Sequence, residues 1–152
     1  MDDSEKQKQK NYVLWLLGRQ DYSRRELERK LQQRQVPEDF ATELLDWCEQ
    51  QRYLDNDRYC TSFIRRAIDK RHGPRRIVAD AQSKGLAREQ VEMALSEMDV
   101  DWFELADEAY RRKYKTVDET LDYKEKAKRI RYLTARGFDF QHIEFALEAK
   151  DE

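Results

Sequence analysis

The apolar residues of this chain recur with the period of an α-helix along almost its whole length. The stretch from Asp57 to Leu86 shows the pattern most clearly, because apolar residues come in adjacent pairs every four positions from Tyr59 to Ile68, on one face of a helix. Pro74 then suits the first position of a second helix, where its missing N–H costs nothing. No segment shows the alternation of a β-strand. The pattern therefore predicts an all-α fold.

The same criteria, applied to the whole chain, predict about nine helices. Ser23 and Glu26 have the spacing of a capping box, and Asp101 can cap a later helix. We expect Gly18 to end the first helix, and residues 1–10 to be frayed or to form its loose first turn. The predicted helices span residues 11–18, 23–35, 38–51, 57–70, 74–84, 87–98, 102–114, 123–135 and 140–149, and the charged segment from Lys115 to Asp122 is the expected linker.

The nine predicted helices form three groups of three with an internal period near 50 residues. A shift of 50 aligns Leu27 with Ile77, and a shift of 52 aligns Gly85 with Gly137, each of which precedes one large apolar residue. Chance similarity among amphipathic helices is the alternative, and the paired glycines argue against it. We therefore predict one elongated domain, residues 1–152, built as a curved array of three tandem three-helix repeats. The repeats are expected to span residues 11–52, 53–98 and 99–152.

Charge divides the chain into blocks that follow these repeats. The chain has 41% charged residues, a net charge of only -2 and a mean hydropathy of -1.10, which suits an elongated helical protein with much exposed surface. Residues 58–76 carry a net charge of +6, whereas residues 86–108 carry -7. Stacked repeats would then have a basic and an acidic side, although charge runs are also typical of ordinary solvated surfaces. A basic side fits phosphate groups or an acidic protein groove.

Residues that carry common enzyme chemistry are scarce or have simpler roles. His72 and His142 lack metal-ligand spacing, so we expect both to be surface or turn residues. Cys48 and Cys60 fall on apolar helix faces, which predicts buried, reduced thiols and a cytoplasmic protein. Ser23 is explained by capping, there is no glycine-rich phosphate loop, and no apolar run is long enough to cross a membrane. We therefore predict a protein that is not an enzyme and needs no metal or cofactor.

Three motifs together resemble the RecX family of regulatory proteins. The helix that starts at Ser23 is similar to the family's Ser-x-x-Glu-Leu-x-x-Lys-Leu pattern, and Tyr53-Leu54-Asp55-Asn56 is similar to its Gly-Tyr-Leu-Asp-Asp segment. Gly73-Pro74 through Gly85-Leu86 resembles its Gly-Pro-x-Arg-Ile…Lys-Gly-Ile unit. The similarity extends from about residue 11 to residue 149. Arg52 stands where the family has a glycine, so we expect the turn there to end the preceding helix differently.

The resemblance implies a monomer that lies in the groove of the RecA filament on single-stranded DNA and restrains recombinase and co-protease activity in recombinational DNA repair. Its basic side would face acidic RecA surface or the DNA, with no cofactor and no membrane contact. The arginines that we expect to make these contacts are Arg24, Arg25, Arg29, Arg65, Arg66, Arg71, Arg75, Arg76, Arg129 and Arg131. The motif residues that we expect to be structural are Tyr53, Leu54, Asp55, Gly73, Pro74 and Gly85, with Asp55 or Asn56 capping a helix.

A general helical nucleic-acid-binding protein without RecA specificity is the alternative interpretation. Such a protein would use the middle helix of a repeat as a recognition helix, but the negative net charge and the lack of a basic arm argue against it. Affinity for bare DNA separates the two interpretations. The regulator would bind DNA weakly and with a strong salt dependence, whereas the DNA-binding protein would bind tightly at physiological salt.

Overall fold

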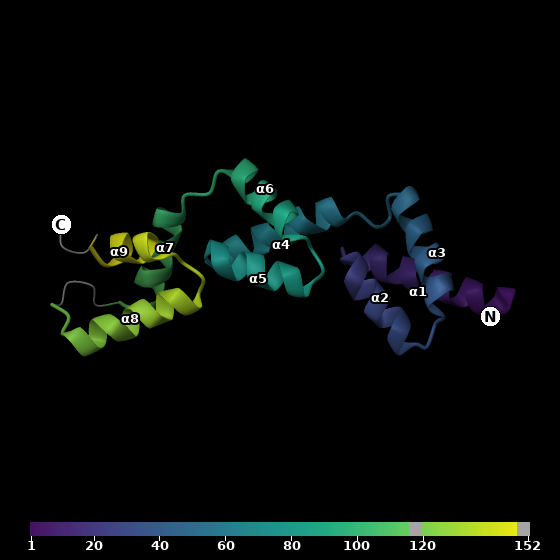
Figure 1. The fold of residues 1–152 in the computed structure, drawn as a ribbon, viewed down its shortest axis with the longest axis horizontal. Coiled ribbons are helices and arrows are strands. Elements are labelled where there is room, and N and C mark those ends of the chain that lie inside the picture. Colours follow the sequence, from purple (N-terminus) through teal and green to yellow (C-terminus); the bar gives the residue numbers. More distant parts are fainter. Residues whose placement is uncertain (116–119, 149–152) are drawn as a thin grey trace.

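A computed structural model gives the fold of residues 1–115 and 120–148, which form nine helices and no strand (Figure 1). The helices are α1 (Asp3–Arg19), α2 (Arg24–Gln33), α3 (Glu38–Gln50), α4 (Asn56–Asp69), α5 (Pro74–Ser83), α6 (Arg88–Met98), α7 (Trp102–Lys113), α8 (Tyr123–Ala135) and α9 (Phe140–Glu148). The predicted all-α fold is confirmed for this part of the chain. Of the predicted linker and the end of the last helix, residues 116–119 and 149 lie outside the described residues.

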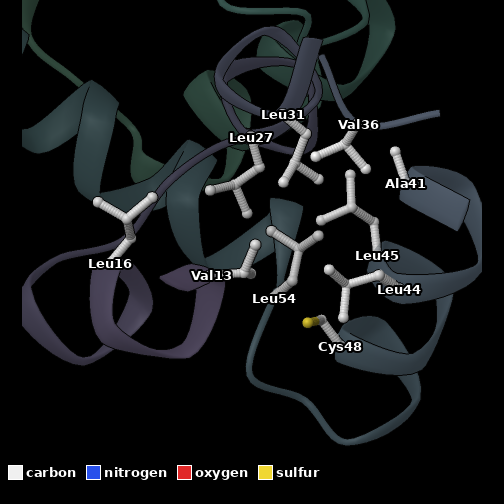
Figure 2. Close-up of a cluster of buried hydrophobic side chains, with 10 residues drawn as sticks. All are labelled: Val13, Leu16, Leu27, Leu31, Val36, Ala41, Leu44, Leu45, Cys48 and Leu54. Carbon is white, nitrogen blue, oxygen red and sulfur yellow. The ribbon is translucent and has the colours of Figure 1, made fainter. Parts of the chain in front are cut away.

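Three bundles of three helices follow one another along the long axis of the molecule (Figure 1). Each bundle has its own cluster of buried apolar side chains, as expected for an array whose units mainly contact their neighbours. Figure 2 shows the first cluster, in which Val13, Leu27, Leu31 and Leu45 have no exposed surface. The predicted elongated array of three-helix repeats is therefore confirmed. Leu54 is also part of this first core, at 2% exposure, so that core extends past the predicted repeat boundary at residue 52.

The first helix is longer than predicted. It begins at Asp3, and the side chain of Asp2 accepts a hydrogen bond from the Glu5 N–H at 2.8 Å, which caps the start. The prediction that Gly18 ends the helix is wrong, because Gly18 lies inside α1 and the chain becomes extended only at Gln20. Nothing lies within 4 Å of the place where a Cβ on Gly18 would sit. This glycine therefore marks an exposed helical position and not a stop.

Most other helix ends follow their sequence signals. Ser23 and Glu26 form the predicted capping box, and Asp55 and Asp101 each accept a hydrogen bond from the backbone N–H three residues later. Several turns use the left-handed backbone that normally favours glycine. Those with positive φ are Gln35, Arg52, Arg71, Gly85, Asp99 and Gly137. Arg52, the residue in place of the family's glycine, thus keeps the left-handed turn with a φ of 61°.

The first seam, between the first and second repeats, is built mainly from side chains. Asn56 Oδ1 accepts a hydrogen bond from the Arg24 N–H at 3.1 Å, so the start of α4 touches the start of α2. Beside it, Lys84 Nζ lies 3.6 Å from a Glu26 carboxylate oxygen. The Arg25 side chain also lies against Gly85, where an added Cβ would come within 2.5 Å of the Arg25 Cβ. The first turn of α2 therefore packs against the left-handed turn that follows α5.

The second seam, between the second and third repeats, is built from backbone. The Gly73 N–H donates to the Arg136 carbonyl at 2.7 Å, and the Arg75 N–H donates to the Gly137 carbonyl at 3.0 Å. A Cβ on Gly73 would lie only 2.3 Å from the Gly137 carbonyl carbon. Trp102 packs against the cores on both sides of this seam. The seam can close this tightly only because Gly73 has no side chain.

His142 is buried, which corrects the prediction that it is a surface or turn residue. It is 5% exposed, in contact with the rings of Phe103 and Phe138 at centroid distances of 4.9 and 6.5 Å. Its Nδ1 accepts a hydrogen bond from the Asp139 N–H at 3.2 Å. Burial lowers the pKa of His142, although the Asp139 carboxylate opposes the shift. The position on α9 faces the apolar side of the third bundle, which the helix pattern alone did not reveal.

We expect Gly73→Ala to lower the free energy of unfolding by about 1–3 kcal/mol, because the new methyl group would collide with the Gly137 backbone. Gly18→Ala is the matched control, and it should raise stability by about 0.5–1 kcal/mol because Ala favours the helix and meets nothing. Urea denaturation followed by far-UV circular dichroism measures both. Wild-type stability in Gly73→Ala would contradict the backbone seam.

We expect Arg52→Gly to raise the free energy of unfolding by about 0.5–1 kcal/mol, because glycine removes the strain of a left-handed backbone at a small entropic cost. The adjacent Gln51→Gly is the control. Gln51 has a φ of -85°, so glycine there relieves no strain and should be neutral or destabilising. Equal changes in the midpoints of thermal unfolding for the two variants would argue against strain at Arg52.

The stability of the protein should decrease as the pH is lowered from 7.5 to 5.5. The pKa values of His72 and His142 are both lowered in the folded state, mainly by burial. Protons therefore bind the unfolded chain first, near pH 6.5, and pull the equilibrium toward it. His142→Asn keeps an acceptor for the Asp139 N–H but cannot titrate, so its unfolding free energy should change less across this range. An unchanged pH slope in the variant would contradict this role of His142.

Candidate interaction surface

The ten arginines predicted to make contacts do not form one uniform surface. Two of them hold helices together within a repeat, three lie at the second seam, and five are exposed without a carboxylate partner among residues 1–115 and 120–148. The sections of chain that carry them are α2, α4, α5 and α8, together with the turn after α4. Burial and ion pairing therefore decide which of these charges can reach a partner.

Arg24 is committed to ion pairs within the first repeat. Its guanidinium lies 2.8 Å from carboxylate oxygens of both Asp46 and Glu49 on α3, and 3.1 Å from Glu28 on its own helix. Burial opposes the charged form of Arg24, but the hydrogen bonds that it donates to Glu49 and Asp46 outweigh this effect and raise the pKa. With its charge matched by three carboxylates, Arg24 joins α2 to α3 and offers little to a partner.

Arg129 is buried in the third repeat. Its side chain is 6% exposed and donates to the Tyr110 hydroxyl at 2.8 Å and to the Glu125 carboxylate at 3.1 Å. The guanidinium also lies 4.3 Å from the centre of the Tyr114 ring. These contacts connect α8 to α7, so Arg129 supports the bundle from within.

Three further arginines lie at or beside the second seam. Arg75 Nε lies 2.5 Å from Asp139 Oδ1, across the seam, while its side chain stays 77% exposed. Arg76 lies 3.5 Å from Asp80 on its own helix, and its backbone lies against Gly137. Arg71 sits in a left-handed turn with Nε 3.5 Å from Glu108 on α7. These charges are accessible in part, but each also has a structural role at the junction.

The remaining five arginines form the exposed set. None of them has an ion pair or hydrogen bond to another side chain within residues 1–115 and 120–148. They are Arg25 and Arg29 on α2, Arg65 and Arg66 on α4, and Arg131 on α8. They are distributed over all three repeats, so an extended partner could meet them in succession.

The residues of the family motifs cap or begin helices or pack against neighbouring side chains. Asp55 is the N-cap of α4, and Gly73 and Pro74 are the N-cap and first residue of α5. Tyr53 is 47% exposed, and its ring centre lies 5.6 Å from that of Trp47. The prediction that Asp55 or Asn56 caps a helix is confirmed for Asp55.

The structure also brings together basic side chains that the sequence did not single out. Lys70, Arg112, Lys113 and Arg136 come from three elements that are distant in sequence and line one groove at the second seam, together with Arg71. The Arg136 side chain donates to the backbone carbonyls of Lys70 and Arg71 across the seam. Of these residues, only Arg71 is among the predicted contacts. The sequence carries no signal for the long-range packing that brings the others beside it.

The described part of the chain offers little for metal chemistry. No group of three or more His, Cys, Asp or Glu residues in residues 1–115 and 120–148 is placed to hold a metal ion. Cys48 and Cys60 are buried free thiols, as predicted, and burial raises the pKa of both. Within the same residues, no helix combines the length and apolar character needed to span a bilayer.

Family models match each of the three repeats in order. The first, second and third three-helix domains of RecX match residues 10–48, 55–95 and 99–147. The chain is 37% identical over 143 residues to the regulatory protein RecX of Vibrio parahaemolyticus, covering 94% of this chain and 92% of that protein. It is 34% identical over 136 residues to that of Pseudomonas entomophila, covering 90% and 87%.

Solved structures agree at the level of the fold. The crystal structure of RecX from Lactobacillus salivarius superimposes with a TM-score of 0.79 and 22% identity, covering 97% of both chains. A second crystal structure of regulatory protein RecX gives a TM-score of 0.81 and 24% identity, covering 97% of this chain and 73% of that one. The three matched domains and the relatives above 30% identity show that the chain belongs to the RecX family of regulatory proteins.

Proposed function

We propose that this protein binds along the RecA filament on single-stranded DNA and lowers its recombinase and co-protease activities, without catalysis of its own. Membership of a family of regulatory proteins supports a regulatory role. The single observation that carries the proposed contact is the exposed set, five arginines that have no carboxylate partner in the described part of the chain and are spread over three tandem repeats. An elongated array of this kind matches a long, repeating partner better than a small round one.

Electrostatics favours a partner with acidic surface. Unpaired, exposed guanidinium groups keep their full attraction for carboxylate or phosphate groups, and they steer association most strongly at low salt. Arg65 and Arg66 stand next to each other on one turn of α4, in the middle repeat. They are therefore the natural centre of the proposed contact, with Arg25, Arg29 and Arg131 toward its two ends.

A general nucleic-acid-binding role remains the second candidate, and one observation favours it: a groove at the second seam gathers five basic side chains. Against it, the whole chain has a net charge of -2. The regulator should bind bare DNA weakly, with an affinity that decreases steeply as salt is raised. Tight, salt-resistant binding to bare DNA would favour the second candidate instead.

The first measurement is the ATPase activity of RecA on single-stranded DNA, titrated with this protein. We expect the activity to decrease. A decrease far below one molecule per RecA protomer would indicate an effect on filament growth or disassembly, whereas a need for near-equal amounts would indicate occupation of the groove. No decrease, together with tight binding to bare DNA, would overturn the proposal.

Reversing two charges of the exposed set should weaken this inhibition. We expect Arg65→Glu with Arg66→Glu to need about tenfold more protein for half-maximal inhibition, because attraction becomes repulsion at the proposed centre. Lys124→Glu with Lys126→Glu is the matched control: it makes the same change in net charge on exposed residues of α8 outside the exposed set. Equal losses in both variants would mean that overall charge, and not the α4 pair, governs inhibition.

A further inference from the structure

The two seams form grooves of different charge. The groove at the first seam is lined by three carboxylates, three Lys or Arg side chains and His72, so its formal charge is near zero with His72 neutral. The groove at the second seam has a volume of about 500 Å³ and is lined by five Lys or Arg side chains and one carboxylate, that of Asp69, a net charge of +4. Lys70 lines both grooves, so they adjoin. Positive charge is therefore concentrated in this second groove.

Most of the cations in this groove are not neutralised by the protein itself. Within residues 1–115 and 120–148, no carboxylate pairs with Lys70, Arg112 or Lys113. Arg71 Nε is buried without a hydrogen-bond acceptor, and the nearest paired carboxylate oxygen, on Glu108, is 3.5 Å away. A cluster of cations with so few carboxylate partners is suited to an anion supplied from outside.

An aromatic ring lies among these cations. Tyr132 of α8 also lines the groove, and its ring centre is 5.5 Å from Lys113 Nζ and 5.8 Å from the Arg136 guanidinium carbon. Aromatic rings stack on bases of any sequence while neighbouring cations hold the phosphates. An acidic peptide would use the cations but would have no use for the ring. The combination therefore fits single-stranded nucleic acid better than an acidic protein segment.

We propose that the groove at the second seam, formed by Lys70, Arg71, Arg112, Lys113, Arg136 and Tyr132, binds the backbone of single-stranded nucleic acid. The inference rests on the proposed function, since a regulator lying on the filament meets the strand within it. It divides the molecule between two partners: the exposed arginines of α4 face acidic protein, and the second seam faces the strand. Binding requires no group transfer and no cofactor.

The test uses the whole protein without RecA and a fluorescein-labelled oligodeoxythymidine as the probe, followed by anisotropy at low salt. We expect Arg112→Gln with Lys113→Gln to lose about tenfold in affinity, and its plot of log affinity against log salt to be shallower by about 1.4, from two lost phosphate contacts. Lys124→Gln with Lys126→Gln removes the same charge from exposed positions near the start of α8, outside the groove, and should keep wild-type affinity. Equal losses in the two variants would overturn the groove as the site.

Two further measurements identify the class of ligand and its place. An oligonucleotide carrying 5-iododeoxyuridine, irradiated with the protein, should form an adduct at Tyr132 that mass spectrometry locates. Adducts confined to Trp15 or Tyr53, exposed aromatic residues outside the groove, would overturn the proposal. Poly-glutamate should compete with the oligonucleotide far less well at equal charge, and equal competition would show an acidic-peptide site instead.

Because no RecA is present, these results are separate from those of the ATPase titration. Loss of oligonucleotide binding in the α7 variant, Arg112→Gln with Lys113→Gln, supports the groove as the binding site whether or not the protein inhibits RecA. If the protein inhibits RecA but its α7 variant binds the oligonucleotide like wild type, the proposed function stands and this inference is overturned.

Discussion

The close approach of Gly73 to Gly137 determines how the second and third repeats are joined. Two backbone hydrogen bonds cross this seam, from the N–H groups of Gly73 and Arg75, and a side chain on Gly73 would prevent both from forming. Backbone contacts fix direction more firmly than pairs of long, exposed side chains, which lose conformational entropy when they are held in one geometry. The groove that gathers cations from α7 and from the turns after α4 and α8 exists because this contact sets their relative positions.

The first and second repeats are instead joined mainly through side chains, at the first seam. Glu26 belongs to the capping box of α2 and also lies near Lys84 of the second repeat, so one carboxylate serves both the helix and the junction. Its pKa is lowered even though burial acts in the opposite direction, because the Ser23 N–H and nearby Lys84 stabilise the charged form. Acids and bases balance around that seam, whereas the second seam keeps an excess of positive charge. Similar repeats thus acquire different surfaces where they meet.

Arginine has different physical roles in this molecule, and not all of them leave the charge available to a partner. Arg24 satisfies three carboxylates, and Arg129 is enclosed by tyrosine and glutamate. Arg65 and Arg66 have no such partners among the residues that the structure describes. Removing a buried, hydrogen-bonded charge leaves its partners unsatisfied, whereas removing an exposed one changes mainly the long-range field. The same residue type can therefore hold the fold in one place and attract a partner in another.

The sequence by itself determined the local structure. Helical periodicity and the Ser23 capping box depend on residues a few positions apart, and they predicted the helices. The paired Gly85 and Gly137 indicated the repeats, and the family motifs are themselves short stretches of sequence. The prediction at Gly18 failed because a glycine exposed in a helix looks the same in sequence as one that ends it. Only the tertiary structure decided which arginines are buried, that His142 is enclosed, and that basic residues from three distant elements share a groove. Those outcomes depend on how the repeats pack against one another, through contacts between residues more than sixty positions apart at the second seam, and no local pattern encodes them.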